Sequence, residues 1–142
     1  MKEVAQILLF DRHRRLLIYL RDNKAEIPFP NHWDFFGGHL EPGETPERAL
    51  ARELKEELGL DAQPSKFFRI YECFDGDAYP NRKFIYSGKT PLAAVELTLR
   101  EGQRLTSITS AERFEFKFAN ILSRVLEDFI AADLWPRPVD KF

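Results

Sequence analysis

The sequence is poor in cysteine: Cys73 is the only one among its 142 residues. A single cysteine cannot form a disulfide within the chain, and structural disulfides belong mainly to oxidising compartments. We therefore expect a protein of a reducing compartment, the cytoplasm. A lone cysteine in an apolar segment is more typical of a packed strand residue than of a nucleophile, and we predict the packing role for Cys73.

Long hydrophobic runs and an excess of one charge are also absent. The longest apolar run, residues 16–20, is far shorter than the roughly 20 residues of a membrane-spanning helix. Near the N-terminus an apolar stretch stops at Asp11, which is not the pattern of a signal peptide. The 21 basic and 23 acidic residues give a formal net charge of −2. We expect neither a membrane nor duplex nucleic acid as a partner.

Apolar residues, in contrast, are plentiful: they make up 44% of the sequence and include 13 phenylalanines. A chain of this length and composition can bury a core without disulfides, so we predict a single domain over residues 1–142. Apolar periodicity predicts a helix at 120–132 and strands at 3–10, 15–21, 33–36, 67–74, 82–88 and 92–100. The first two strands should form a hairpin, as should those at 67–74 and 82–88. A linker is expected at 61–66 and a turn at 75–81.

The most informative stretch runs from Gly38 to Leu60, GHLEPGETPERALARELKEELGL. Thr45 suits the N-cap of a helix, Pro46 suits its first position, and Gly59 suits the left-handed residue that ends it. At about 100° per residue the apolar side chains share one arc and three glutamates share the neighbouring arc. The first set is Leu50, Ala51, Leu54 and Leu58, and the second is Glu53, Glu56 and Glu57.

An acidic helix face has two interpretations. Neighbouring carboxylates repel when ionised, which raises their pKa values. The face is either solvated, with scattered basic residues such as Arg48 and Lys55 around it, or it binds a hard divalent cation. Mg²⁺ prefers oxygen ligands and is commonly held by a few carboxylates together with substrate phosphates. The helix pattern alone leaves both interpretations open.

The same stretch resembles the signature of the Nudix hydrolases, G-x5-E-x7-R-E-U-x-E-E-x-G-U, where U is a bulky apolar residue. Every specified position matches, namely Gly38, Glu44, Arg52, Glu53, Leu54, Glu56, Glu57, Gly59 and Leu60. The preceding segment, residues 33–38, also resembles the family, except that Phe36 stands where proline is commoner. The resemblance implies an α/β protein with the Nudix fold, a mixed β-sheet sandwiched between α-helices.

The resemblance also implies roles for individual residues. Glu53, Glu56 and Glu57 are expected to hold Mg²⁺, or alternatively Mn²⁺, beside the backbone of Gly37 and Gly38. Glu53 is the candidate general base, although the base varies between members of the family.

Two further predictions follow from the same resemblance. Glu44 and Arg52 are expected to interact and to brace the loop against the catalytic helix. In MutT-type members a Glu-Gly-Gln segment supplies a further carboxylate near the metals, and residues 101–103 match it, so we predict Glu101 as a metal ligand. Glu96, on the polar face of the expected strand at 92–100, is the alternative.

Substrate contacts are expected from Gly37, Gly38, Phe35, Arg21 and Asn120. Arg21 precedes a loop at residues 22–32, which either closes over the substrate or merely connects two strands. Asn120 stands where MutT-type enzymes use an asparagine to read a purine, and an N-cap is the alternative role. Most phenylalanines should be core residues, but one or two could stack on a base: Phe67, Phe68, Phe74, Phe114, Phe116 or Phe118.

The function implied is Mg²⁺-dependent hydrolysis of a nucleoside diphosphate linked to another group, with release of a nucleoside monophosphate. A nucleoside triphosphate or its oxidised form is one substrate class, and ADP-ribose or a nucleotide sugar is another. A nucleotide-binding module without catalysis is an alternative of a different kind. The partner is a small nucleotide, and the tail at residues 135–138 packs either on the domain or on a second copy in a homodimer.

Overall fold

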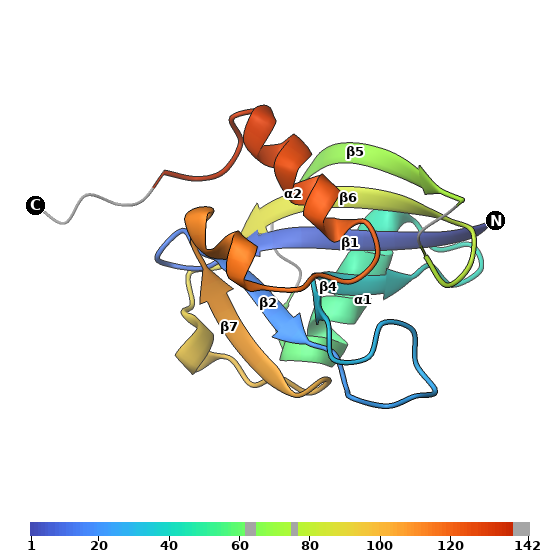
Figure 1. Cartoon of the computed structure of the whole chain (residues 1–142), viewed down its shortest axis with the longest axis horizontal. Coiled ribbons are helices and arrows are strands. Elements are labelled where there is room, and N and C mark those ends of the chain that lie inside the picture. The colour runs from blue at the N-terminus through green and yellow to red at the C-terminus, as the bar shows by residue number, and fades with distance from the viewer. Residues whose placement is uncertain (62–64, 75–76, 138–142) are drawn as a thin grey trace, which may run out of the picture.

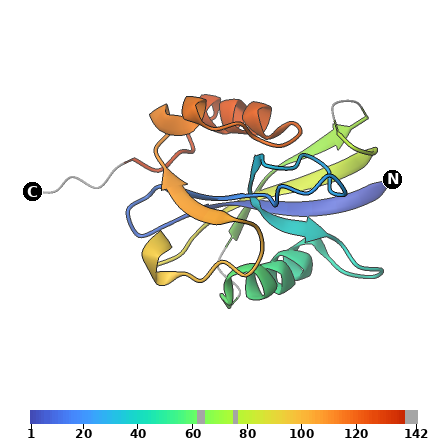
Figure 2. The same ribbon diagram turned by 60° about the horizontal axis from the view of Figure 1, so that its bottom comes forward.

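Two helices lie on opposite faces of one mixed β-sheet, as Figures 1 and 2 show. The computed structural model describes residues 1–61, 65–74 and 77–137, so the predicted linker and the predicted turn at 75–81 lie partly outside the described residues. In chain order the elements are β1 (Lys2–Phe10), β2 (Leu16–Leu20), β3 (Trp33–Asp34), β4 (Phe36–His39), α1 (Pro46–Leu58), β5 (Ser65–Cys73), β6 (Asn81–Lys89), the 3₁₀ helix η1 (Ala94–Glu96), β7 (Arg104–Ile108), the 3₁₀ helix η2 (Ala111–Glu115) and α2 (Leu122–Ala131).

Strand β1 is the centre of the sheet. It runs parallel to β6, from Lys2 beside Asn81 to Phe10 beside Lys89, and antiparallel to β2 and β4. Among the described residues the strand order is β3-β2-β1-β6-β5, with β4 also paired to β1 and β7 paired to β2. The hairpin pairings of β1 with β2 and of β5 with β6 are antiparallel, as predicted. The predicted mixed sheet between helices is therefore confirmed.

The core has two layers because a helix covers each face of the sheet. Leu8 and Phe10 of β1 pack on the α2 side, whereas Ile7 and Leu9 pack on the α1 side. This is why both β1 and β2 read as nearly continuous apolar runs. Cys73 is buried in the layer beneath α2, in agreement with its predicted packing role.

Helix α1 has the ends that its sequence predicts. The Thr45 side chain accepts a hydrogen bond from the Arg48 amide at 3.2 Å, and Pro46 follows it. At the other end Gly59 has a φ of 68° and donates to the carbonyl of Lys55 at 3.0 Å. Such caps satisfy backbone groups that a helix end leaves unpaired.

The buried face of α1 is rotated from the predicted one. Ala49 is buried with the three leucines, whereas Ala51 is only half-buried. Glu57 is buried on the same face because it follows Leu50 by seven residues, close to two helical turns. One of the three glutamates predicted to share an acidic arc therefore belongs to the helix face that packs on the sheet.

The predicted strand at 92–100 is wrong. Residues 94–96 form η1, and the fully extended segment comes later, as β7. Glu96 favours the turn, because its carboxylate accepts a hydrogen bond from the Ala93 amide at 3.1 Å and pairs with Arg12 at 2.8 Å. Val95 is 93% exposed, whereas Leu97 and Leu99 are partly buried against the core on the α1 side. The alternation there thus marked a partly buried segment that is not a strand.

The C-terminal region also differs in detail from the expectation. Helix α2 begins at Leu122 with Ile121 at its N-cap position, so Asn120 is not the N-cap; it has a φ of 38°. The start of the tail packs on the domain: the Trp135 ring lies edge-on to Phe10 with 5.2 Å between centroids. Pro138, the last residue of the predicted tail, lies outside the described residues. No helix among the described residues is long and apolar enough to cross a membrane.

Candidate active site

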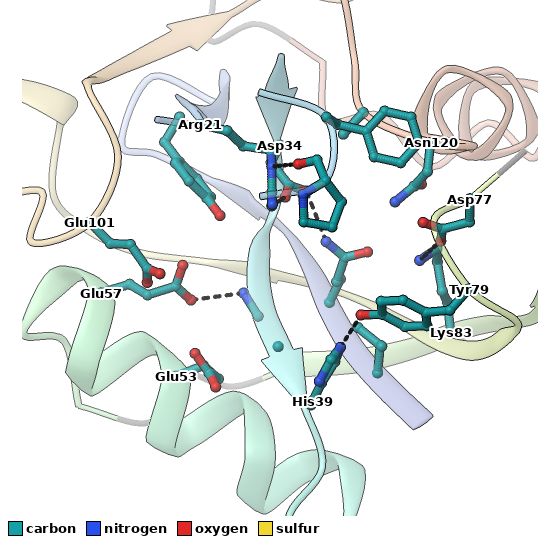
Figure 3. Close-up of a pocket in the computed structure, with 18 residues that line it drawn as sticks. Arg21, Asp34, His39, Glu53, Glu57, Asp77, Tyr79, Lys83, Glu101 and Asn120 are labelled. Atoms are coloured by element: carbon teal, nitrogen blue, oxygen red, sulfur yellow. Dashed lines mark hydrogen bonds and ion pairs between the residues drawn. The ribbon is translucent and has the colours of Figure 1, made fainter. Parts of the chain in front are cut away.

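A cavity of about 280 Å³ opens where α1, the glycines of β4 and the N-terminal half of β1 meet. Its walls come from segments far apart in the sequence, and Figure 3 shows the side chains that line it. Glu53, Glu57 and Glu101 lie on one side, while Asp77, Tyr79 and Lys83 lie on the other. Asp34 lies between these two groups.

Two of the carboxyl groups on the acidic side, Glu57 and Glu53, have raised pKa values. Glu57 is only 1% exposed, and its carboxylate accepts a hydrogen bond from the Gly37 amide at 3.0 Å. Burial raises the pKa of Glu57 to about 9; the Gly37 amide opposes this rise, and repulsion from Glu53 and Glu101 adds to it. Burial also raises the pKa of Glu53, against the opposing effect of Arg52.

This donor set suits a hard cation. All three carboxyl groups offer oxygen, and a cation between them would relieve their mutual repulsion. The described residues contain no group of three or more His, Cys, Asp or Glu side chains already placed to hold a metal. The chemistry of the oxygens, rather than a finished coordination shell, is what fits a hard divalent cation here.

Arg52 ties the loop before α1 to the helix. Its Nε and Nη2 atoms donate to the two carboxylate oxygens of Glu44, each at 2.9 Å, and Nη1 donates to Glu53 at 2.9 Å. Nη2 also donates to the carbonyl of His39 at 2.9 Å. The hydrogen bonds from Arg52 lower the pKa of Glu44 to about 2. The interaction expected between Glu44 and Arg52 is therefore present.

Glu56 is placed differently from the other two glutamates of the motif. Its side chain is 60% exposed and lies 3.6 Å from Arg52 Nη1. It does not line the cavity, although it follows Glu53 by three residues on the same helix. The structure thus brings Glu53, Glu57 and Glu101 together and leaves Glu56 beside them, toward solvent.

The two glycines of β4 allow the close approach of three segments. A Cβ atom on Gly37, which has a φ of +132°, would lie 2.1 Å from the backbone oxygen of Ala5. A Cβ atom on Gly38 would lie 2.6 Å from the carboxylate of Glu53. Both glycines line the cavity. A side chain at Gly37 would meet backbone, whereas one at Gly38 would meet the movable end of Glu53.

Arg21 lines the cavity as part of a polar network that sequence reasoning missed. Its Nη1 atom donates to Asp34 Oδ2 at 2.9 Å. Asp34 Oδ1 accepts hydrogen bonds from the Phe35 amide at 2.8 Å and from Gln6 Nε2 at 3.0 Å. Burial raises the pKa of Asp34, and these donors oppose the rise. The available signal was a polar residue inside an otherwise apolar strand, which describes both Gln6 and Asp34.

The far side of the cavity holds a second buried network. Lys83 and Asp77 form an ion pair at 3.0 Å, with side chains only 4% and 8% exposed. Burial raises the pKa of Asp77, but hydrogen bonds from Asn81 and Lys83 outweigh that effect and the net pKa is lowered. Tyr79 hydrogen-bonds to the His39 ring at the rim. Asn120, a predicted substrate contact, also lines the cavity. Asp77, Tyr79 and Lys83 line it as well but were not predicted as substrate contacts.

Phe35 was wrongly predicted as a substrate contact. It is fully buried and packs on Phe118, with ring centroids 6.2 Å apart, because its side chain faces the core beneath α2. None of the six phenylalanines considered for base stacking lines the cavity; Phe29 does instead. Glu96, the alternative to Glu101, is outside the cavity as well.

The loop at 22–32 is part of the cavity wall, since Pro28 and Phe29 both line it. Arg21 Nε donates to the Pro28 carbonyl at 3.0 Å. Gln103 Nε2 donates to the carbonyl of Arg21 at 2.6 Å and to Asn31 Oδ1 at 3.1 Å. The loop therefore does more than connect two strands.

The family model for the NUDIX domain matches residues 2–123 of the chain. The chain belongs to the Nudix family. The predicted resemblance is thus confirmed.

Curated Nudix relatives match over part of their length. An 8-oxo-dGTP diphosphatase of Proteus vulgaris is 43% identical over 58 residues, which are 41% of this chain and 50% of the relative. Phosphatase NudJ of Escherichia coli K12 is 42% identical over 55 residues, which are 39% of this chain and 36% of NudJ. The match thus spans half or less of these relatives.

Solved Nudix structures share the whole fold. The MutT protein of Methanosarcina mazei Go1 superposes with a TM-score of 0.77 at 15% identity, covering 93% of this chain and 94% of that one. The NUDIX domain of Shewanella oneidensis NrtR, solved in complex with ADP ribose, gives 0.76 at 16% identity, covering 92% and 86%. At such low identity these likenesses concern the fold alone.

Proposed function

We propose that this protein is a Mg²⁺-dependent Nudix pyrophosphohydrolase. Its substrate is a nucleoside diphosphate linked to another group, with a nucleoside triphosphate or its oxidised form as the first choice. The observation that carries the proposal is the gathering of Glu53, Glu57 and Glu101 in one cavity beside the backbone of Gly37 and Gly38. A protein that only bound nucleotides would gain nothing from burying carboxyl groups that repel both one another and a phosphate.

In this proposal Glu53, Glu56, Glu57 and Glu101 hold the cation, and Mn²⁺ can replace Mg²⁺. When bound, the cation supplies positive charge for the phosphates and lowers the pKa of water. Glu56 is included because it follows Glu53 on the same helix and belongs to the family motif. Arg52 and Glu44 position the helix against the loop, and Arg52 orients Glu53 through the bond at 2.9 Å.

Glu53 is the proposed general base. A water oxygen forms a bond to phosphorus while the anhydride P–O bond breaks, and its electron pair leaves with the departing phosphate oxygen. The water proton passes to the Glu53 carboxylate. Arg52 holds this carboxylate through the hydrogen bond at 2.9 Å, and a general base must be positioned within hydrogen-bond reach of the water whose proton it accepts.

The nucleoside is proposed to occupy the part of the cavity lined by Arg21, Phe29 and Asn120, away from the glutamates. The name of the Proteus vulgaris relative favours a nucleoside triphosphate. The ADP ribose complex of the NrtR domain favours ADP-ribose or a nucleotide sugar as a second candidate class.

A substrate panel tests the proposal. The purified protein is incubated with dNTPs, 8-oxo-dGTP, ADP-ribose, dinucleoside polyphosphates and nucleotide sugars, with and without Mg²⁺. We expect a nucleoside monophosphate to be released from at least one compound, and only with Mg²⁺ or Mn²⁺. Tight nucleotide binding without turnover and without a metal requirement would instead identify a binding module.

A further inference from the structure

Gln6 carries a buried oxygen without a partner. Its side chain lies in the middle of β1, the residue is 6% exposed, and it lines the cavity. Its Oε1 atom meets no hydrogen-bond donor among the described residues. Buried polar atoms are almost always hydrogen-bonded, so an exception in a cavity wall calls for an explanation.

The orientation of the Gln6 amide is fixed by Asp34. Asp34 Oδ1 accepts from the backbone amide of Phe35 at 2.8 Å, and Oδ2 accepts from Arg21 at 2.9 Å. Gln6 therefore turns its Nε2 atom toward Asp34 Oδ1, at 3.0 Å. The reverse orientation would place two acceptor oxygens against each other, so Oε1 points away from Asp34 as an acceptor.

This acceptor lies on the face of β1 that turns away from α1, although Gln6 and Glu57 line one cavity. Gln6 is paired with Gly37, whose amide donates to Glu57 of α1. The side chain of Gln6, however, shares its face of β1 with Leu8 and Phe10, which pack on the α2 side. If the phosphates bind near Glu57, the organic part of the ligand is the part that reaches Gln6. Phe29, which lines the same cavity, offers this part an aromatic surface.

We infer that Gln6 determines base specificity, with its Oε1 atom accepting a hydrogen bond from an N–H group of the nucleobase. This inference rests on the proposed function. It adds that the site recognises a nucleobase by a hydrogen-bond donor on its edge. The preferred base carries an N–H donor at the position facing Gln6, and an analogue without that donor leaves the oxygen buried and unpaired.

Pairs of nucleotides that differ by one N–H group test this inference. dGTP and dITP differ by the 2-amino group, and dATP and purine deoxyriboside triphosphate by the 6-amino group. 8-oxo-dGTP and dGTP differ by the N–H at position 7 together with the oxygen at C8. For wild-type protein we expect kcat/KM to favour the N–H member of at least one pair by about tenfold or more. For Gln6→Met, which has similar size but no acceptor, we expect that ratio to fall to about 1.

The ratio separates recognition from a merely structural role. If Gln6 only positioned Asp34, Gln6→Met and Gln6→Leu would lower kcat/KM equally for both members of a pair and leave their ratio unchanged. That result would overturn the inference, as would wild-type ratios within about twofold for every pair, a result that requires no variant to fold.

Binding of the matching nucleoside monophosphates, measured by calorimetry, separates this inference from the hydrolase proposal. Base-dependent binding that Gln6→Met abolishes, in a protein without turnover, would support the role of Gln6 and overturn the proposed hydrolysis. Turnover with the same kcat/KM for both members of every pair would support the proposed hydrolysis and overturn the role of Gln6.

Discussion

Arg52 donates two hydrogen bonds of 2.9 Å each to the carboxylate of Glu44, from Nε to Oε2 and from Nη2 to Oε1. The same guanidinium donates to Glu53 on its own helix and to the carbonyl of His39 in the preceding strand. One side chain thus joins β4, the loop that follows and α1. Such a planar fork matches a carboxylate in a way that a lysine ammonium cannot.

We predict that Arg52→Lys preserves the charge and still damages the protein. A lysine cannot make both hydrogen bonds to Glu44 and the one to Glu53 at once. The loop that carries Glu44 and the side chain of Glu53, the proposed general base, would then be held less well in position. We expect kcat/KM to fall by about 10- to 100-fold, as for other residues that orient catalytic groups. Steady-state kinetics at saturating Mg²⁺ measure this.

The matched control is Arg48→Lys, an exposed arginine on the same helix. It should leave kcat/KM within about twofold of wild type, because exposed substitutions away from special features have small effects. Equal activity of the Arg52 and Arg48 variants would contradict the positioning role of Arg52.

The two glycines of β4 should respond differently to alanine. In Gly37→Ala the new Cβ atom meets the Ala5 backbone oxygen at 2.1 Å, and the φ of +132° is unfavourable for alanine. The backbone of β1 cannot move aside without breaking the pairing of the strand, so we expect a loss of about 3 kcal/mol or more in the free energy of unfolding. Urea denaturation measures this loss.

In Gly38→Ala the new Cβ atom meets the end of the Glu53 side chain at 2.6 Å, and that side chain can rotate. We expect a smaller loss of stability, about 1 kcal/mol, with a clear loss of activity because the proposed base is displaced. A Gly38→Ala enzyme with wild-type kcat would show that the position of Glu53 does not matter for catalysis.

Local signals predicted the motif helix well. Thr45, Pro46 and Gly59 mark its ends through groups within a few residues, and such short-range chemistry is readable from sequence. The burial of Glu57 was not decided in the same way, because spacing places it both with Glu53 and Glu56 and, seven residues after Leu50, beside the apolar face. Its burial depends on β4 lying against α1, which is a tertiary contact.

Long-range contacts also explain the failures at Phe35 and at residues 92–100. A phenylalanine next to the glycine loop could face either the substrate or the core, and only the packing of Phe118 beneath α2 decides for the core. At residues 92–100 the alternation suggested a strand, but the Glu96 carboxylate accepts a hydrogen bond from the nearby Ala93 amide and forms a long-range ion pair with Arg12 of the first hairpin turn. The cavity network of Gln6, Asp34 and Arg21 joins residues from three strands or their ends, which no local pattern could reveal.

Removing single carboxylates should locate the metal site. We predict that Glu53→Gln, Glu57→Gln and Glu56→Gln each lower kcat/KM by about 100-fold or more, because each removes a negative oxygen that holds the cation. Glu101→Gln should have a smaller effect and mainly raise the Mg²⁺ concentration needed for half-maximal activity. Titrations of activity against Mg²⁺ measure both quantities.

The matched control is Glu115→Gln, an exposed glutamate outside the cavity. It removes the same charge and should leave the Mg²⁺ dependence unchanged. If Glu57→Gln kept wild-type turnover at saturating Mg²⁺, the proposed site would be wrong.

The titration of Glu57 predicts how stability varies with pH in the absence of metal. Its pKa in the folded protein is raised from 4.5 to about 9, so between these values the folded state binds a proton that the unfolded state has lost. Stability from this group is therefore fully present below pH 4.5 and is lost as pH rises toward 9. Glu57→Gln cannot ionise, so the melting temperature of this variant should fall less than that of wild type between pH 6 and 9.

Mg²⁺ should reverse this difference. A cation beside Glu57 favours its ionised form and binds only the folded state, so it should raise the melting temperature of wild type by several degrees at pH 8. Glu57→Gln offers no charge there and should gain much less. The measurement is thermal unfolding with and without 10 mM Mg²⁺, with Ca²⁺ and a matched ionic strength of NaCl as controls. Equal stabilisation of both proteins by Mg²⁺ would mean that the ion binds elsewhere, because Glu57 would then contribute nothing to holding it.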